Sequence, residues 1–153
     1  AGGTDPRRAW PENKWIKLAE ILSKNHQIAI VKTPETTNLI QHMIDRDLMV
    51  EIFDGDLIKF KNWLRNQKML IGNDSMPGHL AAYLGIPAIS IFGSQDPKLT
   101  CPIGKWITII QPNESCEHKR NHWRLCQKCM GTIDVERVSG AVTNLLSIAQ
   151  AGE

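Results

Sequence analysis

The chain has 153 residues, of which 42% are hydrophobic and 22% charged, a composition ordinary for one globular domain. Its net charge of +2 and pI of about 8.4 exclude the strongly basic balance of a dedicated nucleic-acid binder. No run reaches the roughly 18 apolar residues of a membrane span, and the opening AGGTDPRRAW has no apolar signal core, so we expect a soluble chain.

Short apolar segments alternate with amphipathic ones along the first hundred residues. Apolar residues at helical spacing predict a helix over 11–23, where Pro11 suits a first turn. The aliphatic stretch QIAIVK (27–32) ends at a Thr-Pro turn, which predicts a buried strand. Further helices are expected over 35–45, 56–65 and 78–84, and further strands over 48–53, 68–71 and 87–92.

The alternation weakens after Phe92, through GSQDPKLTCPIGK. One more strand is expected over 106–110, a long polar loop over 111–128 and a closing amphipathic helix over 134–149. Short strands that alternate with helices of about ten residues are typical of a parallel sheet with helices on both faces. The predicted fold class is therefore α/β, with a Rossmann-like parallel sheet.

The segment NDSMPGH (73–79) lies where a strand meets a helix, the position at which open parallel sheets bind ligands. Asp74 or Ser75 can cap the helix, and Gly78 lets another group approach the backbone. Unpaired amides and the helix dipole favour an anion such as phosphate. The alternative is that Asp74 is only a helix cap and His79 only a packed helix residue.

Proline in this turn limits the number of amides that can face a phosphate. Pro77 has no N–H, which leaves the amides of Gly78, His79 and Leu80 as the expected donors. Asp74 accepts hydrogen bonds only when ionised, so it is expected to orient loop amides rather than touch phosphate.

Three segments resemble the heptosyltransferase family of GT-B glycosyltransferases. NDSMPGHLAAYLGIPAISIFGSQDP is similar to the family's signature, and RAWPE (8–12) to its basic-x-Trp-Pro-Glu segment. CQKCMGTIDVERV resembles its late Cys-Met element, so the resemblance covers nearly the whole chain in order. In one departure, Met76 and Gly78 exchange the places where the family has glycine and a larger residue.

The resemblance implies the C-terminal, donor-binding domain of a GT-B fold over residues 1–153, a fragment without the N-terminal acceptor domain. The opening Ala1-Gly2-Gly3-Thr4, a Gly-rich loop without an initiator Met, agrees with this expectation. The implied reaction is inverting transfer of heptose from ADP-heptose to a lipopolysaccharide core saccharide. The general base would come from the acceptor domain, so the chain alone would bind donor without turnover.

The resemblance also implies a cytoplasmic bacterial enzyme, at or near the inner face of the inner membrane, that needs no cofactor. Arg8 would stabilise the leaving diphosphate, while the hydroxyl of Ser75 and the imidazole of His79 would donate to it. The full set of expected donor-binding residues is Thr4, Arg8, Glu35, Gly55, Asp74, Ser75, Met76, Gly78 and His79.

Two of these assignments have structural alternatives. Arg7 and Arg8 together could be a solvated pair. Glu35 follows a predicted strand, where a carboxylate can bind ribose hydroxyls, but it could also be an ordinary glutamate at a helix start. Gly55 and Leu57 follow the next strand and are expected to border the base.

Cysteine and histidine gather late in the chain, and Cys101 lies apart from them. Cys116, His118, His122, Cys126 and Cys129 could supply tetrahedral zinc ligands. The segment has one Cys-x-x-Cys pair and its other spacings match no familiar zinc motif, so we expect reduced thiols and no metal. The alternative is a zinc ion bound by Cys116, His118, Cys126 and Cys129. A non-catalytic phosphate-binding module and a zinc-stabilised interaction domain are the competing functions.

Overall fold

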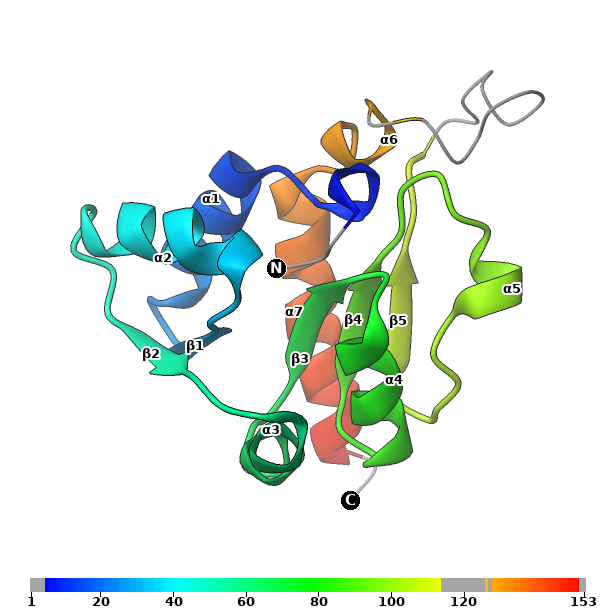
Figure 1. Ribbon diagram of the computed structural model, residues 1–153. Helices are drawn as coiled ribbons and strands as arrows, with labels where there is room; N and C mark the ends of the chain where they lie inside the picture. Colours follow the sequence, from blue (N-terminus) through cyan, green and yellow to red (C-terminus); the bar gives the residue numbers. More distant parts are fainter. Residues whose placement is uncertain (1–4, 114–125, 127, 152–153) are drawn as a thin grey trace.

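A computed structural model describes residues 5–113, 126 and 128–151 (Figure 1). The strands are β1 (Ile28–Val31), β2 (Val50–Phe53), β3 (Leu70–Asn73), β4 (Ala88–Ile91) and β5 (Ile107–Ile110). The helices are α1 (Glu12–Leu22), α2 (Thr37–Ile44), α3 (Leu57–Leu64), α4 (Met76–Tyr83), α5 (Pro97–Thr100), α6 (Lys128–Gly131) and α7 (Val135–Ala151), with 3-10 turns η1 (Pro6–Arg8) and η2 (Pro34–Thr36).

Every strand pairing is parallel, and the strands form two sheets with the orders β1-β2 and β3-β4-β5. Leu70 lies opposite Ala88 in the β3-β4 pair, and Ala88 lies opposite Ile107 in the β4-β5 pair. Helices connect successive strands, as parallel pairing requires. The predicted α/β class is confirmed.

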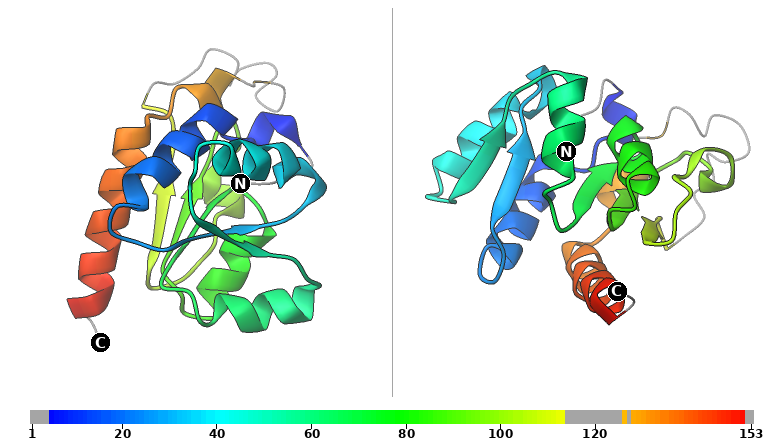
Figure 2. Two further views of the ribbon diagram at one scale, coloured as in Figure 1. Left: turned by 90° about the vertical axis from the view of Figure 1, so that its left-hand side faces the viewer. Right: turned by 90° about the horizontal axis from the view of Figure 1, so that it is seen from below.

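Two hydrophobic clusters cover the two faces of the strands. The large core, beneath α1, α2 and α7, consists of Trp10, Trp15, Ile16, Leu18, Ala19, Ile30, Leu39, Ile40, Met43, Ile89, Ile91, Ile110, Met130, Ile133, Val135, Val138, Val142 and Leu145. The small core, beneath α3 and α4, consists of Phe60, Leu64, Ala81, Ile86 and Ala88. Figure 2 shows α7 on one side of the strands and α3 and α4 on the other.

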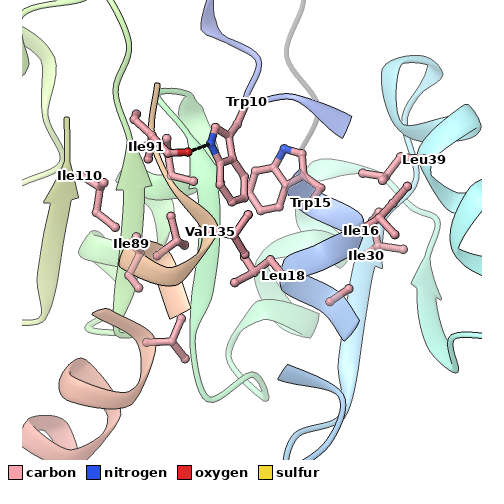
Figure 3. Close-up of a cluster of buried hydrophobic side chains, with 14 of the residues drawn as sticks. Trp10, Trp15, Ile16, Leu18, Ile30, Leu39, Ile89, Ile91, Ile110 and Val135 are labelled. Carbon is pink, nitrogen blue, oxygen red and sulfur yellow. Dashed lines mark hydrogen bonds between the residues drawn. The ribbon is translucent and has the colours of Figure 1, made fainter. Parts of the chain in front are cut away.

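Two tryptophans lie at the centre of the large core. The rings of Trp10 and Trp15 meet edge to face with centroids 5.0 Å apart, a favourable aromatic geometry. Figure 3 shows them between Ile91 of β4 and Leu39 of α2. The Trp10 indole N–H donates to the carbonyl of Ile133 at 3.0 Å, so its one polar group is satisfied where it is buried.

Most predicted elements are present with boundaries shifted by no more than two residues, and the difference that matters most at the site concerns β3. The expected strand 68–71 is observed as Leu70–Asn73, because its ladder with β4 continues through the polar end of the segment. The short α5, whose first turn is capped by Asp96 accepting from the amide of Lys98 at 3.0 Å, was not predicted. A single turn of helix is too short to show a period.

The expected loop over 111–128 lies largely outside the described residues, and α6 begins at its last residue. Of the helices that the structure describes, none is both long and apolar enough to cross a membrane. The longest, α7, has 17 residues.

Candidate functional site

The carboxyl end of β3 is the meeting point of the chain's first described turn and α4. The backbone N–H of Trp10, just after η1, donates to the side-chain oxygen of Asn73 at 3.1 Å. The N–H of Asp74 donates to the carbonyl of Ile91 at 3.0 Å, which continues the β3-β4 ladder by one bond. These two bonds place η1 beside the turn that leads into α4 (Figure 1).

Asp74 and Arg8 form the charged centre of this region. Asp74 is 5% exposed, and its Oδ2 lies 3.5 Å from Nη1 of Arg8, whose side chain is 39% exposed. Within the described residues, Oδ2 of Asp74 and Nε of Arg8 are buried and accept or donate no hydrogen bond. The site therefore has one buried carboxylate oxygen and one buried guanidinium N–H whose hydrogen-bonding capacity is unused.

The electrostatics of Asp74 follow from this burial. Loss of solvation raises the pKa of the Asp74 carboxyl above its usual value, and the charges of Arg8 and His79 partly oppose the rise. A buried carboxylate with an unsatisfied oxygen costs stability. Buried carboxyl groups with a shifted pKa and an unused hydrogen-bond acceptor cluster at functional sites, so Asp74 is a functional-site candidate.

The two neighbouring arginines have different partners. Arg7 donates to Asp5 through its backbone N–H, Nε and Nη2, at 3.0, 2.8 and 2.8 Å. The hydrogen bonds from Arg7 lower the pKa of Asp5 to about 2. Arg8 has no such carboxylate clamp, and faces Asp74 instead, so the two side chains are not an equivalent solvated pair.

The start of α4 offers fewer hydrogen-bond donors than the sequence suggested. Ser75 is the N-cap residue but makes no side-chain cap; its hydroxyl donates to the carbonyl of Asn73 at 3.1 Å. The N–H of Gly78 donates to the carbonyl of Ser75 at 3.2 Å. The expectations of a side-chain cap from Ser75 and an available Gly78 amide are therefore wrong, because both groups already have local backbone partners.

Gly78 is needed for packing between α4 and β4. A Cβ at this position would lie 2.7 Å from Oγ of Ser90 and 3.1 Å from Cγ of Pro102. Protein atoms thus occupy the space that we expected a ligand to approach. Met76 and His79 are exposed on the same turn, Met76 by 53%.

Glu35 and Gly55 lie in turns that follow β1 and β2. Glu35 is exposed at the start of η2, where its own backbone amide and the Thr33 hydroxyl lower its pKa. At the exposed Gly55 a Cβ would lie 2.9 Å from the ring carbon Cζ of Phe53 and 3.2 Å from Cβ of Lys59, so protein side chains border this glycine. Within the described residues, neither residue forms a hydrogen bond or ion pair with Arg8 or Asp74. Thr4 lies outside the described residues.

Sequence reasoning missed Asn73 as an organising residue. It is 1% exposed and accepts the bond from Trp10 that ties η1 to β3. An amide side chain at the end of an apolar strand, directly before a carboxylate, is the signal that could have indicated it, since buried polar groups need partners.

The late cysteines give a partial view of the proposed zinc alternative. Sγ of Cys126 and Sγ of Cys129 are 3.6 Å apart, and Cys129 is buried at the start of α6. Cys116, His118 and His122 lie outside the described residues. No group of three metal-ligating side chains occurs among the residues that are described, so the zinc alternative is untested.

A parallel α/β fold with polar residues at the carboxyl end of its strands is of the Rossmann-like class, in which ligands bind at that edge of the sheet. Residues 2–129 match glycosyltransferase family 9 (heptosyltransferase), and the chain belongs to that family. No curated protein matches the sequence significantly.

Solved structures share the fold at low sequence identity. E. coli ADP-heptose LPS heptosyltransferase II is 17% identical, with a TM-score of 0.79, and the match covers 98% of this chain and 45% of that one. E. coli heptosyltransferase WaaC with ADP is 19% identical, with a TM-score of 0.77, covering 94% and 42%. A family 9 glycosyltransferase from Veillonella parvula is 19% identical, with a TM-score of 0.79, covering 95% and 44%. The chain thus spans less than half the length of these proteins.

Proposed function

We propose that this chain supplies the donor site of a glycosyltransferase that transfers heptose, with inversion, from ADP-heptose to a lipopolysaccharide core saccharide. Residues 1–153 would be the donor-binding domain, and a second domain would hold the acceptor and provide the general base. Family membership supports a transferase. Of the similar structures, one is named as an ADP-heptose LPS heptosyltransferase and another as a heptosyltransferase with ADP. Both names support ADP-heptose as the donor.

The observation that carries the proposal is the pair formed by Arg8 and Asp74. The partly exposed guanidinium of Arg8 lies 3.5 Å from the Asp74 carboxylate, so that carboxylate can orient it toward an anion at the end of β3. A guanidinium presents several N–H donors in a fixed plane, which suits a diphosphate. Arg8 would stabilise the negative charge that grows on the diphosphate as it leaves.

Neighbouring groups would contribute less than Arg8. Pro77 lacks an N–H and the Gly78 amide bonds Ser75, so few amides of α4 are available to a phosphate. The exposed imidazole of His79 and the hydroxyl of Ser75, after it leaves the Asn73 carbonyl, are the remaining side-chain donors. Glu35 and Gly55 would lie toward the ribose and base. The donor nucleotide sugar is a substrate, and the proposal includes no cofactor.

Calorimetric titration of the chain with ADP, and with UDP for comparison, tests this proposal. We expect ADP-selective binding, and a loss of about 10- to 100-fold in affinity for Arg8→Ala, the value of one charge-assisted contact. Arg7→Ala is the matched control, because the adjacent guanidinium is engaged with Asp5. Equal losses in the two variants, or none in either, would contradict a specific role for Arg8.

A non-catalytic nucleotide- or phosphate-binding module of the same fold is the second candidate, and it is favoured by the departure of the loop at Met76 and Gly78 from the family's pattern. The two candidates differ in turnover by the complete protein. If the chain joined to its acceptor domain binds ADP but releases no ADP from ADP-heptose in the presence of acceptor, the module is the better description.

A further inference from the structure

The late cysteines take no part in the proposed transfer reaction, and two of them lie in contact. Sγ of Cys126 and Sγ of Cys129 are 3.6 Å apart, within the range of a thiol hydrogen bond. Cys101, the third cysteine that the structure describes, follows α5 and makes no contact with another thiol among the described residues. Chemistry that needs two neighbouring thiols therefore has one place in the described part of the chain.

The two thiols differ in their access to solvent. Cys129 is 3% exposed, whereas Cys126 is half-buried. A reagent in solution therefore reaches Cys126 first, because thiol reactions depend on access to the attacking sulfur. A reachable thiol with a second thiol beside it is the arrangement in which the first is modified and the second resolves the product.

Cys129 is held in place by the backbone and the core around it. Its carbonyl accepts from the Thr132 hydroxyl at 2.8 Å and from the Thr132 N–H at 3.2 Å. The next residue, Met130, is 1% exposed, and its Cγ would lie 2.7 Å from a Cβ at Gly93. Cys126 lies before α6 and is less buried, so it is the partner that can move.

Closing a bond between the two sulfurs needs only a small displacement. A disulfide has an S–S length of about 2.0 Å, so the two sulfurs, now 3.6 Å apart, must approach each other by about 1.6 Å. Rotation of one side chain between staggered positions moves a sulfur by more than this distance. The Cys-x-x-Cys spacing is also that of proteins whose dithiols and disulfides interconvert. The pair can therefore close while α6 keeps its place.

We propose that Cys126 and Cys129 form a thiol–disulfide exchange site that reacts with small-molecule disulfides. The Cys126 thiolate attacks one sulfur of the reagent, whose S–S bond breaks, and the first thiolate leaves. The Cys129 thiolate then attacks Sγ of Cys126, the mixed disulfide breaks, and the second thiolate leaves. The two cysteines lose two electrons to the reagent, and their two protons pass to the released thiolates.

The exchange site lies beside the candidate site for the donor. Figure 1 shows α6 at the end of the strands where η1 lies. The Cβ position at Gly93 that meets Met130 is also 3.6 Å from the carbonyl of Arg7 in η1. Because the movement falls on Cys126, we expect closure to leave this packing unchanged. The inference therefore stands or falls independently of the proposed glycosyl transfer.

Disulfide mapping by mass spectrometry tests the inference. The reduced, folded chain is incubated with glutathione disulfide, quenched with acid and N-ethylmaleimide, and digested with trypsin. We expect the peptides that carry Cys126 and Cys129 to be joined by a disulfide, which excess dithiothreitol separates. Trypsin places each cysteine of the chain in a different peptide, namely 99–105, 106–119, 125–128 and 129–137.

Variants of the pair separate the two roles. Cys129→Ser should stop at the mixed disulfide on Cys126, because the resolving thiol is gone. In Cys126→Ser the buried Cys129 should be modified at least tenfold more slowly than Cys126 is in Cys129→Ser. Cys101→Ser is the matched control, and its pair should close at the rate of the unmodified chain. Tryptophan fluorescence verifies that each variant is folded.

Several results would overturn the inference. One is a mixed disulfide that persists on Cys126 in the unmodified chain, and another is a disulfide from peptide 106–119 to either partner. A third is modification that occurs only in urea, because both thiols would then be out of reach in the folded chain. Zinc at about one equivalent in the purified chain, with exchange only after a chelator removes it, would assign the pair to a metal site instead.

Discussion

Replacing Gly78 with alanine tests whether this glycine serves packing between α4 and β4. The added Cβ would lie 2.7 Å from Oγ of Ser90, well inside the 3.4 Å at which ordinary contact begins. Overpacking of this kind costs about 1–3 kcal/mol, and alanine recovers up to about 1 kcal/mol through its better helix propensity. We expect Gly78→Ala to lower the free energy of unfolding by about 1–2 kcal/mol.

The assay is urea unfolding followed by tryptophan fluorescence, supported by thermal melting. For a chain of this length, 1 kcal/mol corresponds to about 2–4 °C in Tm. Ser90→Ala removes the atom that the new Cβ meets, while the contact to Pro102 at 3.1 Å remains. In the Ser90→Ala background, Gly78→Ala should therefore cost at least about 1 kcal/mol less than it costs alone.

An equal cost of Gly78→Ala in the two backgrounds would refute this reasoning, because the cost would then arise elsewhere than at Ser90. A neutral Gly78→Ala that abolishes ADP binding would also refute it. That result would restore the role expected from sequence, in which the glycine admits a ligand.

Asp74→Asn should raise the free energy of unfolding at pH 7 by about 1 kcal/mol, because it removes a buried charge with an unsatisfied oxygen. Burial raises the Asp74 pKa, so the folded state binds the proton more tightly, and the free energy of unfolding of the unmodified chain falls as pH rises above the ordinary pKa of 3.8. The stability gained by Asp74→Asn should therefore vanish near pH 3. An equal gain at pH 3 and pH 7 would contradict this cause. Trp10→Phe should cost about 2–3 kcal/mol in urea unfolding, because it shrinks a ring that is 2% exposed and removes the N–H that donates to the Ile133 carbonyl. Lys14 Nζ donates to the same carbonyl, at 2.8 Å. Combining Trp10→Phe with Lys14→Met should cost more than the sum of the single changes, and strict additivity would show that this carbonyl is not their shared partner.

The alternation of strands and helices was predictable because each element follows from a local pattern. QIAIVK needs only its own aliphatic residues and the Thr-Pro turn to indicate a strand. The end of β3 was harder to predict, since the polar Asn73 belongs to the strand and is used by Trp10, 63 residues away in sequence. Distant partners of this kind leave no periodic signal.

The candidate site was predictable in its location and less so in its contacts. A strand, a turn with Asp74 and a helix placed the region at the carboxyl end of the sheet. The partners of Arg7 and Arg8 could not be read from two adjacent arginines, because the choice depends on Asp5 and Asp74. Likewise, Gly78 meets Ser90 and Pro102, and neither contact is visible until the fold brings α4 onto β4.

The bonds from Trp10 and Lys14 to the segment before α7 affect where this domain can be divided. Lys14 Nζ donates to the carbonyls of Gly131 and Ile133, and the Trp10 indole donates to Ile133. The family match ends at residue 129, before all of these acceptors and before α7. A protein truncated there would lose α7, which packs on α1. It would also lose the Ile133 carbonyl that holds Trp10, a residue two positions from Arg8. The cooperative folding unit therefore extends through α7, beyond the boundary that sequence similarity marks.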